Sequence, residues 1–158
     1  MIRGVDAGDR DAIAALHLAR WRDAYRGVLP DGFLDGGLAD ELGTLWAERD
    51  LGRTVTLVSH AADGLDGFAC CLTDRAVPYV DNLHVRPGRR RSGTGDALMR
   101  ALFARLREAS HQAAELTVLE GNARARAFYR QQGGIEGVAR AATLVGHPIR
   151  EVPVRFAL

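Results

Sequence analysis

Hydrophobic residues at helical spacing occupy the first third of the chain. Ile13, His17, Trp21 and Tyr25 recur every four positions, so they share one face of a predicted helix over about 9–25. We interpret His17 and Trp21 as core residues of that helix. A segment rich in Gly, Pro and Asp follows. A short helix is expected near residue 31, and a further helix over about 40–50.

Strand-like runs replace this spacing in the middle of the chain. Arg53–His60 and Phe68–Thr73 flank the turn signal Asp63–Gly67 and predict a hairpin, and Val77–Arg86 predicts a third strand. The later predicted elements are a helix over 95–110, a strand over 114–120, a helix from the cap Asn122 to about 132, and strands over about 135–144 and 149–156.

This order of elements predicts the fold class. Strands interspersed with helices are typical of a mixed α/β sheet with helices on both faces. A length of 158 residues is that of one domain, so we expect residues 1–158 to form a single domain. Cys70 and Cys71 are adjacent in a predicted strand and should point to opposite faces, which suits reduced thiols better than a disulfide framework.

Composition excludes several classes of protein. The net charge is only +1 and the arginines are not interleaved with aromatic residues, so we expect no nucleic-acid partner. All 21 basic residues are arginine, which removes every mechanism that needs a lysine. The N-terminus lacks the apolar core of a secretory signal, and no uncharged apolar run approaches the ~18 residues of a membrane span. We therefore expect a cytoplasmic protein with no membrane partner.

A glycine-rich turn, "RPGRRRSGTGD", joins the third strand to the next helix. A Walker A loop needs a lysine where Thr94 stands, and a dinucleotide fingerprint needs a third glycine where Leu98 stands. The pattern R-x-x-G-x-G does fit, from Arg90 through Gly93 to Gly95. Such a loop offers several backbone amides and a helix dipole to one anion, so the sequence predicts a pyrophosphate site.

A second motif follows downstream in "LTVLEGNARARAFYRQQGG", with Asn122 as helix cap and Phe128 and Tyr129 farther along. Together with Val85, Pro87 and the loop, it resembles the acetyl-CoA site of the GCN5-related N-acetyltransferase (GNAT) superfamily. The resemblance covers nearly the whole chain. It implies a mixed, mostly antiparallel central sheet of six to seven strands, with helices on both faces and a V-shaped opening between two central strands for acetyl-CoA.

The resemblance also implies the cofactor contacts. The backbone of Leu83, His84 and Val85 would pair with the pantetheine arm of coenzyme A, which Asn122 would also hydrogen-bond. Tyr129 would lie beside the thioester sulfur. The backbone amides expected to bind the pyrophosphate are those of Arg90, Arg91, Ser92, Gly93, Thr94, Gly95 and Asp96.

In this family the amine attacks the thioester directly. Tyr129 is the expected acid for the departing thiolate. Asp81 or His84 is the candidate base, unless the neutral amine binds and no base is used. Tyr25 and Arg26, beside the break after the first helix, are the candidate acceptor-binding residues.

The resemblance implies an acetyl-CoA-dependent N-acetyltransferase, and we expect it to act on a primary amine of a small molecule. The alternatives are a protein or peptide N-acetyltransferase and a non-catalytic acyl-CoA-binding regulatory domain. The histidines match no metal-ligand spacing, so no metal is expected. A homodimer is a further expectation, because Val152, Val154 and Phe156 alternate as they would on an exposed edge strand.

Overall fold

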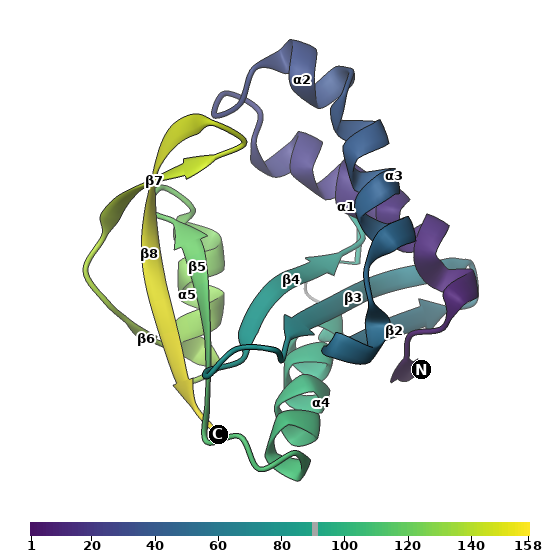
Figure 1. The fold of residues 1–158 in the computed structure, drawn as a ribbon, viewed down its shortest axis with the longest axis vertical. Coiled ribbons are helices and arrows are strands. Elements are labelled where there is room, and N and C mark those ends of the chain that lie inside the picture. Colours follow the sequence, from purple (N-terminus) through teal and green to yellow (C-terminus); the bar gives the residue numbers. More distant parts are fainter. Residues whose placement is uncertain (90–91) are drawn as a thin grey trace.

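The computed structural model describes residues 1–89 and 92–158, which form one mixed sheet flanked by helices (Figure 1). The strand order is β1-β2-β3-β4-β5-β8-β6, and β7 also pairs with β8. The strands are β1 Ile2–Gly4, β2 Thr54–Ala61, β3 Gly64–Leu72, β4 Tyr79–Val85, β5 Ala113–Leu119, β6 Ile135–Glu136, β7 Arg140–Leu144 and β8 His147–Ala157. The helices are α1 Arg10–Ala24, α2 Asp31–Asp35, α3 Leu38–Glu48, α4 Thr94–Glu108 and α5 Ala123–Gln131, with 3-10 turns η1 Ala7–Asp9 and η2 Leu51–Arg53.

The predicted fold class is confirmed, with eight strands in place of six or seven. All pairings are antiparallel except that between β4 and β5. One face of the sheet packs on α4 and α5, and the other packs on α1 and α3. Cys71 belongs to the first of these cores and Cys70 to the second, as strand alternation predicts.

Strands β4 and β5 meet only at one end. Their register pairs Tyr79 with Glu115 and goes no farther, so the two strands diverge from that point (Figure 1). β4 also carries an extra residue, because Cys70 faces Asn82 and Cys71 faces Val80, which leaves Asp81 as a bulge. The predicted V-shaped opening is therefore present, and the bulge lies on its wall.

A helical cap and the last hairpin stand on the two sides of this opening. Leucines of α2 and α3 form a separate apolar cluster, and Trp21 and Tyr25 at the end of α1 pack against it. Leu144, at the end of β7, packs against the same cluster. The β7–β8 hairpin thus reaches across to the helices near α2 (Figure 1). Among the described residues, no helix is both long and apolar enough to cross a bilayer.

Three local predictions were wrong. The β2–β3 turn is tighter than expected, because β3 begins at Gly64 and continues the ladder through Gly67. The strand predicted over 135–144 is two short strands, β6 and β7, each paired with a different part of β8. Val152, Val154 and Phe156 do not form an exposed edge: they are 1–2% exposed, because they face the α4 and α5 core while β8 is paired on both sides. The exposed-edge argument for the dimer is thereby removed, and the dimer itself stays a prediction.

Candidate active site

Two adjoining cavities occupy the opening between β4 and β5. The larger, about 1070 Å³, is lined by α1, α3, β4 from Tyr79 to His84, β5 and the β7–β8 hairpin. The smaller, about 690 Å³, is lined by the end of β4, the β5–α5 connection and α5. Both are lined by Leu83, Leu119, Asn122 and Tyr129, so these residues mark the place where the cavities meet.

The predicted cofactor strand lies on the wall of both cavities. Leu83 lines both, Val85 lines the smaller and His84 lines the larger. Because β5 pairs with β4 only at Tyr79, no strand of the described residues lies beside the backbone from Leu83 to Val85 on this side. An extended ligand can therefore hydrogen-bond this edge as an added strand does.

The glycine-rich loop ends at the N-terminus of α4. Arg90 and Arg91 lie outside the described residues. Gly93 has φ 81°, a left-handed conformation that favours glycine, and turns the chain into the helix at Thr94. A Cβ at Gly95 would lie 3.4 Å from the ring of Phe128 and 3.7 Å from a Val85 methyl group, and both of those residues line the smaller cavity.

This arrangement fits the pyrophosphate of coenzyme A. A helix provides no carbonyl for its first amides, here those of Thr94, Gly95 and Asp96. The Thr94 N–H makes only a long hydrogen bond of 3.4 Å to Ser92 Oγ, and the Gly95 and Asp96 amides have no partner among the described residues, so these N–H groups can meet an anion. The Asp96 carboxylate is turned aside, since its Oδ1 accepts a hydrogen bond from Gln132 Nε2. Ser92 is exposed, and its hydroxyl donates to the Arg89 carbonyl at 2.6 Å.

Helix α5 brings the second motif to the junction of the cavities. Asn122 caps the helix, its Oδ1 accepting from the Ala125 amide at 3.1 Å. Tyr129 lies two turns farther along and is half-buried. Burial, and then the neighbouring phenols of Tyr25 and Tyr79, raise the pKa of Tyr129, so its hydroxyl holds its proton at neutral pH.

The bulge residue Asp81 lines the larger cavity and pairs with Arg49 from the end of α3. Arg49 Nη2 donates to Asp81 Oδ2 at 2.9 Å, and Arg49 Nη1 lies 3.1 Å from the Cys70 sulfur. Asp81 Oδ1 accepts no hydrogen bond within residues 1–89 and 92–158, so one carboxylate oxygen is available to a ligand. Burial raises the pKa of Cys70, which makes this thiol unreactive.

His84 lies against His17 from α1, with ring centroids 4.8 Å apart. Burial, followed by electrostatic interaction with the His17 ring and with Arg20, holds the pKa of His84 well below its usual value. His17 is only 2% exposed, and burial followed by Arg49 lowers its pKa to about 4. Both imidazoles are therefore neutral at physiological pH.

Trp46 fixes the tautomer of His17. The indole N–H donates to His17 Nδ1 at 3.0 Å, and because an indole nitrogen only donates, the ring proton must be on Nε2. His17 Nε2 lies 3.4 Å from the amide nitrogen of Asn82, whose Oδ1 is buried and has no partner in the described part of the chain. Rotating the Asn82 side-chain amide by half a turn lets Oδ1 accept from the His17 Nε2–H, and the two N–H donors of the amide then point to the opposite side.

Only one of the two candidate acceptor-binding residues lies at the cavities. Tyr25 lines the larger cavity, whereas Arg26 lines neither cavity and pairs with Asp35 through two hydrogen bonds of 2.9 Å. Sequence reasoning missed Arg20, Arg49 and Asn82, which all line the larger cavity. Arg20 follows His17 by three positions, and Asn82 precedes His84 by two, so helical and strand periodicity could have found them. No sequence signal brings Arg49 to β4.

His17 and Trp21, interpreted from sequence as core, also line the larger cavity. His17 is buried as expected, but its contacts are with His84 and Asn82 on the cofactor strand. Among the residues that the structure describes, no three His, Cys, Asp or Glu side chains could hold a metal ion together.

Comparisons with known proteins agree with this geometry. Residues 16–134 match the model of the acetyltransferase (GNAT) family. No curated protein matches the chain. Many solved structures share its fold, three of which follow. PaiA N-acetyltransferase of Thermoplasma acidophilum, in complex with coenzyme A, is 13% identical, with a TM-score of 0.80 over 100% of this chain and 98% of the other.

The second is the ribosomal-protein-alanine N-acetyltransferase of Brucella melitensis, 18% identical, with a TM-score of 0.76 over 100% and 99% of the two chains. The third is yncA of Salmonella typhimurium in a structure with acetyl-CoA, 17% identical, with a TM-score of 0.76 over 100% and 93%. At these identities the likeness shows the fold.

Proposed function

Because the chain belongs to the acetyltransferase (GNAT) family and is an acetyl-CoA-dependent acetyltransferase, we propose that it acetylates a primary amine of a small molecule. The observation that carries the proposal is the meeting of the two cavities at Tyr129. The smaller cavity extends from there along the open edge of β4, and the larger extends toward charged and aromatic side chains. A donor and an acceptor can thus meet beside one phenol.

Acetyl-CoA, when bound, supplies an activated thioester carbonyl. The first amides of α4 would bind its pyrophosphate, and the β4 edge from Leu83 to Val85 would hold the pantetheine arm, which Asn122 would also hydrogen-bond. A backbone N–H of this edge is also placed to polarise the carbonyl as charge develops on its oxygen. The expected contribution of the Arg90 and Arg91 amides to the pyrophosphate site stays a prediction.

Tyr129 would give its proton to the departing thiolate. Its raised pKa keeps the phenol protonated until a strong base forms beside it, which suits an acid for a thiolate. Its position on the walls of both cavities supports this role.

Asp81 is the better supported of the two candidate bases. Its Oδ2 is held by Arg49, and Oδ1 accepts no hydrogen bond in the described residues, so that oxygen can accept a proton from the amine. His84 is a weaker candidate, since burial and its charged neighbours disfavour the protonated ring. A third route, in which the neutral amine binds and no base acts, makes no use of either side chain.

A small acceptor fits the larger cavity better than a polypeptide does. Leu144 of the β7–β8 hairpin packs against the leucine cluster of α2 and α3, which closes that side of the opening to an extended chain. Asp40, Glu41 and Glu151 line the same cavity, with the aromatic rings of Trp21 and Tyr25. Carboxylates and aromatic faces both attract an ammonium group.

The proposal is tested by measuring thiol release from acetyl-CoA with polyamines, amino acids, aminoglycosides and peptides. Turnover with small amines and not with peptides is the expected result, and the reverse preference would select the protein-acetylating alternative. Binding of acetyl-CoA without turnover on any amine would select the regulatory alternative. Binding weaker than millimolar, measured by calorimetry, would contradict all three.

Tyr129→Phe tests the acid. It keeps the ring packing and removes the hydroxyl, so acetyl-CoA affinity should stay within two-fold while kcat falls roughly 100-fold, the size of effect expected for a general acid. A variant with full turnover would exclude the role. We also propose that residues 1–158 act as one acetyltransferase domain. The homodimer remains a prediction, which light scattering of the purified chain tests.

A further inference from the structure

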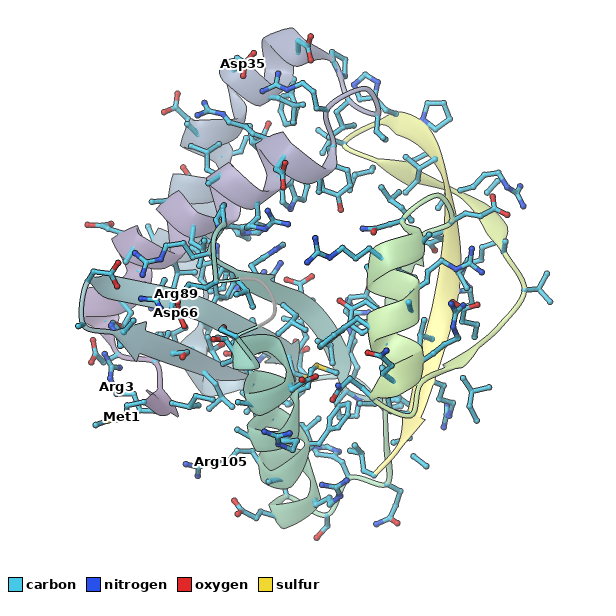
Figure 2. All side chains as sticks on the ribbon, turned by 180° about the vertical axis from the view of Figure 1, so that it is seen from behind. Met1, Arg3, Asp35, Asp66, Arg89 and Arg105 are labelled. Atoms are coloured by element: carbon cyan, nitrogen blue, oxygen red, sulfur yellow. The ribbon has the colours of Figure 1, made fainter. Side chains whose placement is uncertain are left out.

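Asp66 is a buried carboxylate directly beneath the start of α4. It lies in β3 and is 7% exposed. Its Oδ2 accepts a hydrogen bond from the Thr94 hydroxyl at 2.8 Å, and its Oδ1 lies 3.4 Å from Arg89 Nε. Figure 2 shows Asp66 and Arg89 next to each other. Oδ1 accepts no hydrogen bond from any residue that the structure describes.

A buried negative charge at this position is unexpected. The amides of Thr94 to Asp96 are the proposed site of a pyrophosphate, and a nearby carboxylate repels phosphate oxygens. Asp66 is partly compensated, since Arg86 lies 3.9 Å away and Arg89 lies 3.4 Å away. Simple repulsion nevertheless predicts that the protein would bind the cofactor better without this carboxylate.

The contacts of Thr94 indicate a different role. Thr94 is the first residue of α4, and its methyl group packs so closely on β3 that a Cβ at Gly67 would lie 3.3 Å from it. Its hydroxyl lies 2.8 Å from the Ser92 hydroxyl, and Ser92 in turn donates to the Arg89 carbonyl. Asp66 is the only buried charged group in this chain of contacts among the described residues, so it ties the helix start and the preceding turn to β3.

We propose that Asp66 is a positioning residue for the cofactor. By holding Thr94 and Arg89 it keeps the first amides of α4 in the arrangement that receives the pyrophosphate, before the cofactor binds. The gain from a preformed site outweighs the repulsion from one compensated carboxylate. This inference rests on the proposed function, because the pyrophosphate is that of coenzyme A.

Asp63 provides the matched control. Its carboxylate is exposed and pairs with the same two arginines, 2.7 Å from Arg86 and 3.4 Å from Arg89, but it has no contact with Thr94 among the described residues. Asp66→Ala and Asp63→Ala each remove one negative charge beside the loop. Repulsion predicts that both variants bind coenzyme A more tightly. Positioning predicts about ten-fold weaker binding for Asp66→Ala and a change within two-fold for Asp63→Ala.

Thr94→Val and Thr94→Ser test the same contact without changing charge. The valine keeps the shape and loses the hydroxyl, so we expect about ten-fold weaker binding of coenzyme A by calorimetry. The serine keeps the hydroxyl and should restore the affinity. In turnover assays the KM for acetyl-CoA should rise in Asp66→Ala and Thr94→Val, while kcat at saturating acetyl-CoA stays within two-fold.

Hydrogen exchange without any ligand completes the test. Positioning predicts faster amide exchange over 92–97 in Asp66→Ala and Thr94→Val than in the unaltered chain. Unchanged exchange together with tighter binding by Asp66→Ala would overturn the inference, as would equal effects of the Asp66 and Asp63 variants. If the unaltered chain fails to bind coenzyme A, the proposed function fails, whereas exchange still decides whether Asp66 orders the helix start.

Discussion

His17 should make the protein sensitive to acid, and replacing it with asparagine should remove much of that sensitivity. The side chain is 2% exposed, and its pKa is lowered to about 4 from an ordinary value of 6.5. Asparagine cannot take up a proton, and its Oδ1 can still accept from the Trp46 indole. The comparison therefore isolates the protonation of one buried imidazole.

The direction in which pH changes the free energy of unfolding follows from proton binding at His17. Between pH 6.5 and 4 the unfolded chain binds a proton at His17 and the folded chain does not, so acidification through this window favours unfolding. Titration of His17 has no effect on the free energy of unfolding above pH 7, and the destabilisation that it causes grows as the pH falls to about 4. The difference between the two pKa values corresponds to about 3 kcal/mol lost at pH 4.

Urea unfolding at half-unit intervals from pH 4 to 7.5 measures this loss. The free energy of unfolding should fall by about 3 kcal/mol less in His17→Asn than in the unaltered chain. A residual fall is expected because the pKa of His84, whose ring contacts His17, is also lowered. Parallel curves for the two proteins would refute the assignment of His17 as a buried neutral base.

Substitutions at three further residues test other parts of the structure. Asn122→Ala removes the cap of α5 and should cost about 1 kcal/mol in urea unfolding and weaken coenzyme A binding, while Asn122→Ser should retain the stability. Gly134→Ala places a Cβ 2.6 Å from a Val154 methyl group and should lower the free energy of unfolding by roughly 1–3 kcal/mol; a neutral result would contradict the packing at α5. Arg49→Leu leaves the Asp81 carboxylate without its partner and should cost roughly 1–3 kcal/mol, with kcat reduced if Asp81 is the base; full stability would show that the pair contributes little.

Local signals explain most of what sequence reasoning predicted correctly. The glycine spacing 93–95 and the Asn122 cap act over a few residues of backbone, and both appear where expected. Two of the three wrong predictions depended on distant partners. The segment 135–144 has strand character, but β8 offers it two separate pairings, so it divides into β6 and β7.

The predicted edge at Val152 failed for the same reason, because only the partners of a strand decide whether its face is buried. Alternation placed Val152, Val154 and Phe156 on one face, as observed. Whether that face met solvent or a core depended on α4 and α5 packing against it. Strand pairing on both sides of β8 then removed the edge itself.

The sequence by itself determined the cofactor loop, the α5 motif and the order of elements, because each is a short-range pattern of backbone conformation and spacing. It also limited the chemistry that was possible, since a chain without lysine leaves tyrosine, histidine, cysteine, aspartate and glutamate for proton transfer. Only the tertiary structure decided which of these residues share a cavity. Arg49 meets Asp81 and His17 meets Asn82 across 32 and 65 positions, and such contacts depend on how α1 and α3 pack on β4, which no local pattern encodes.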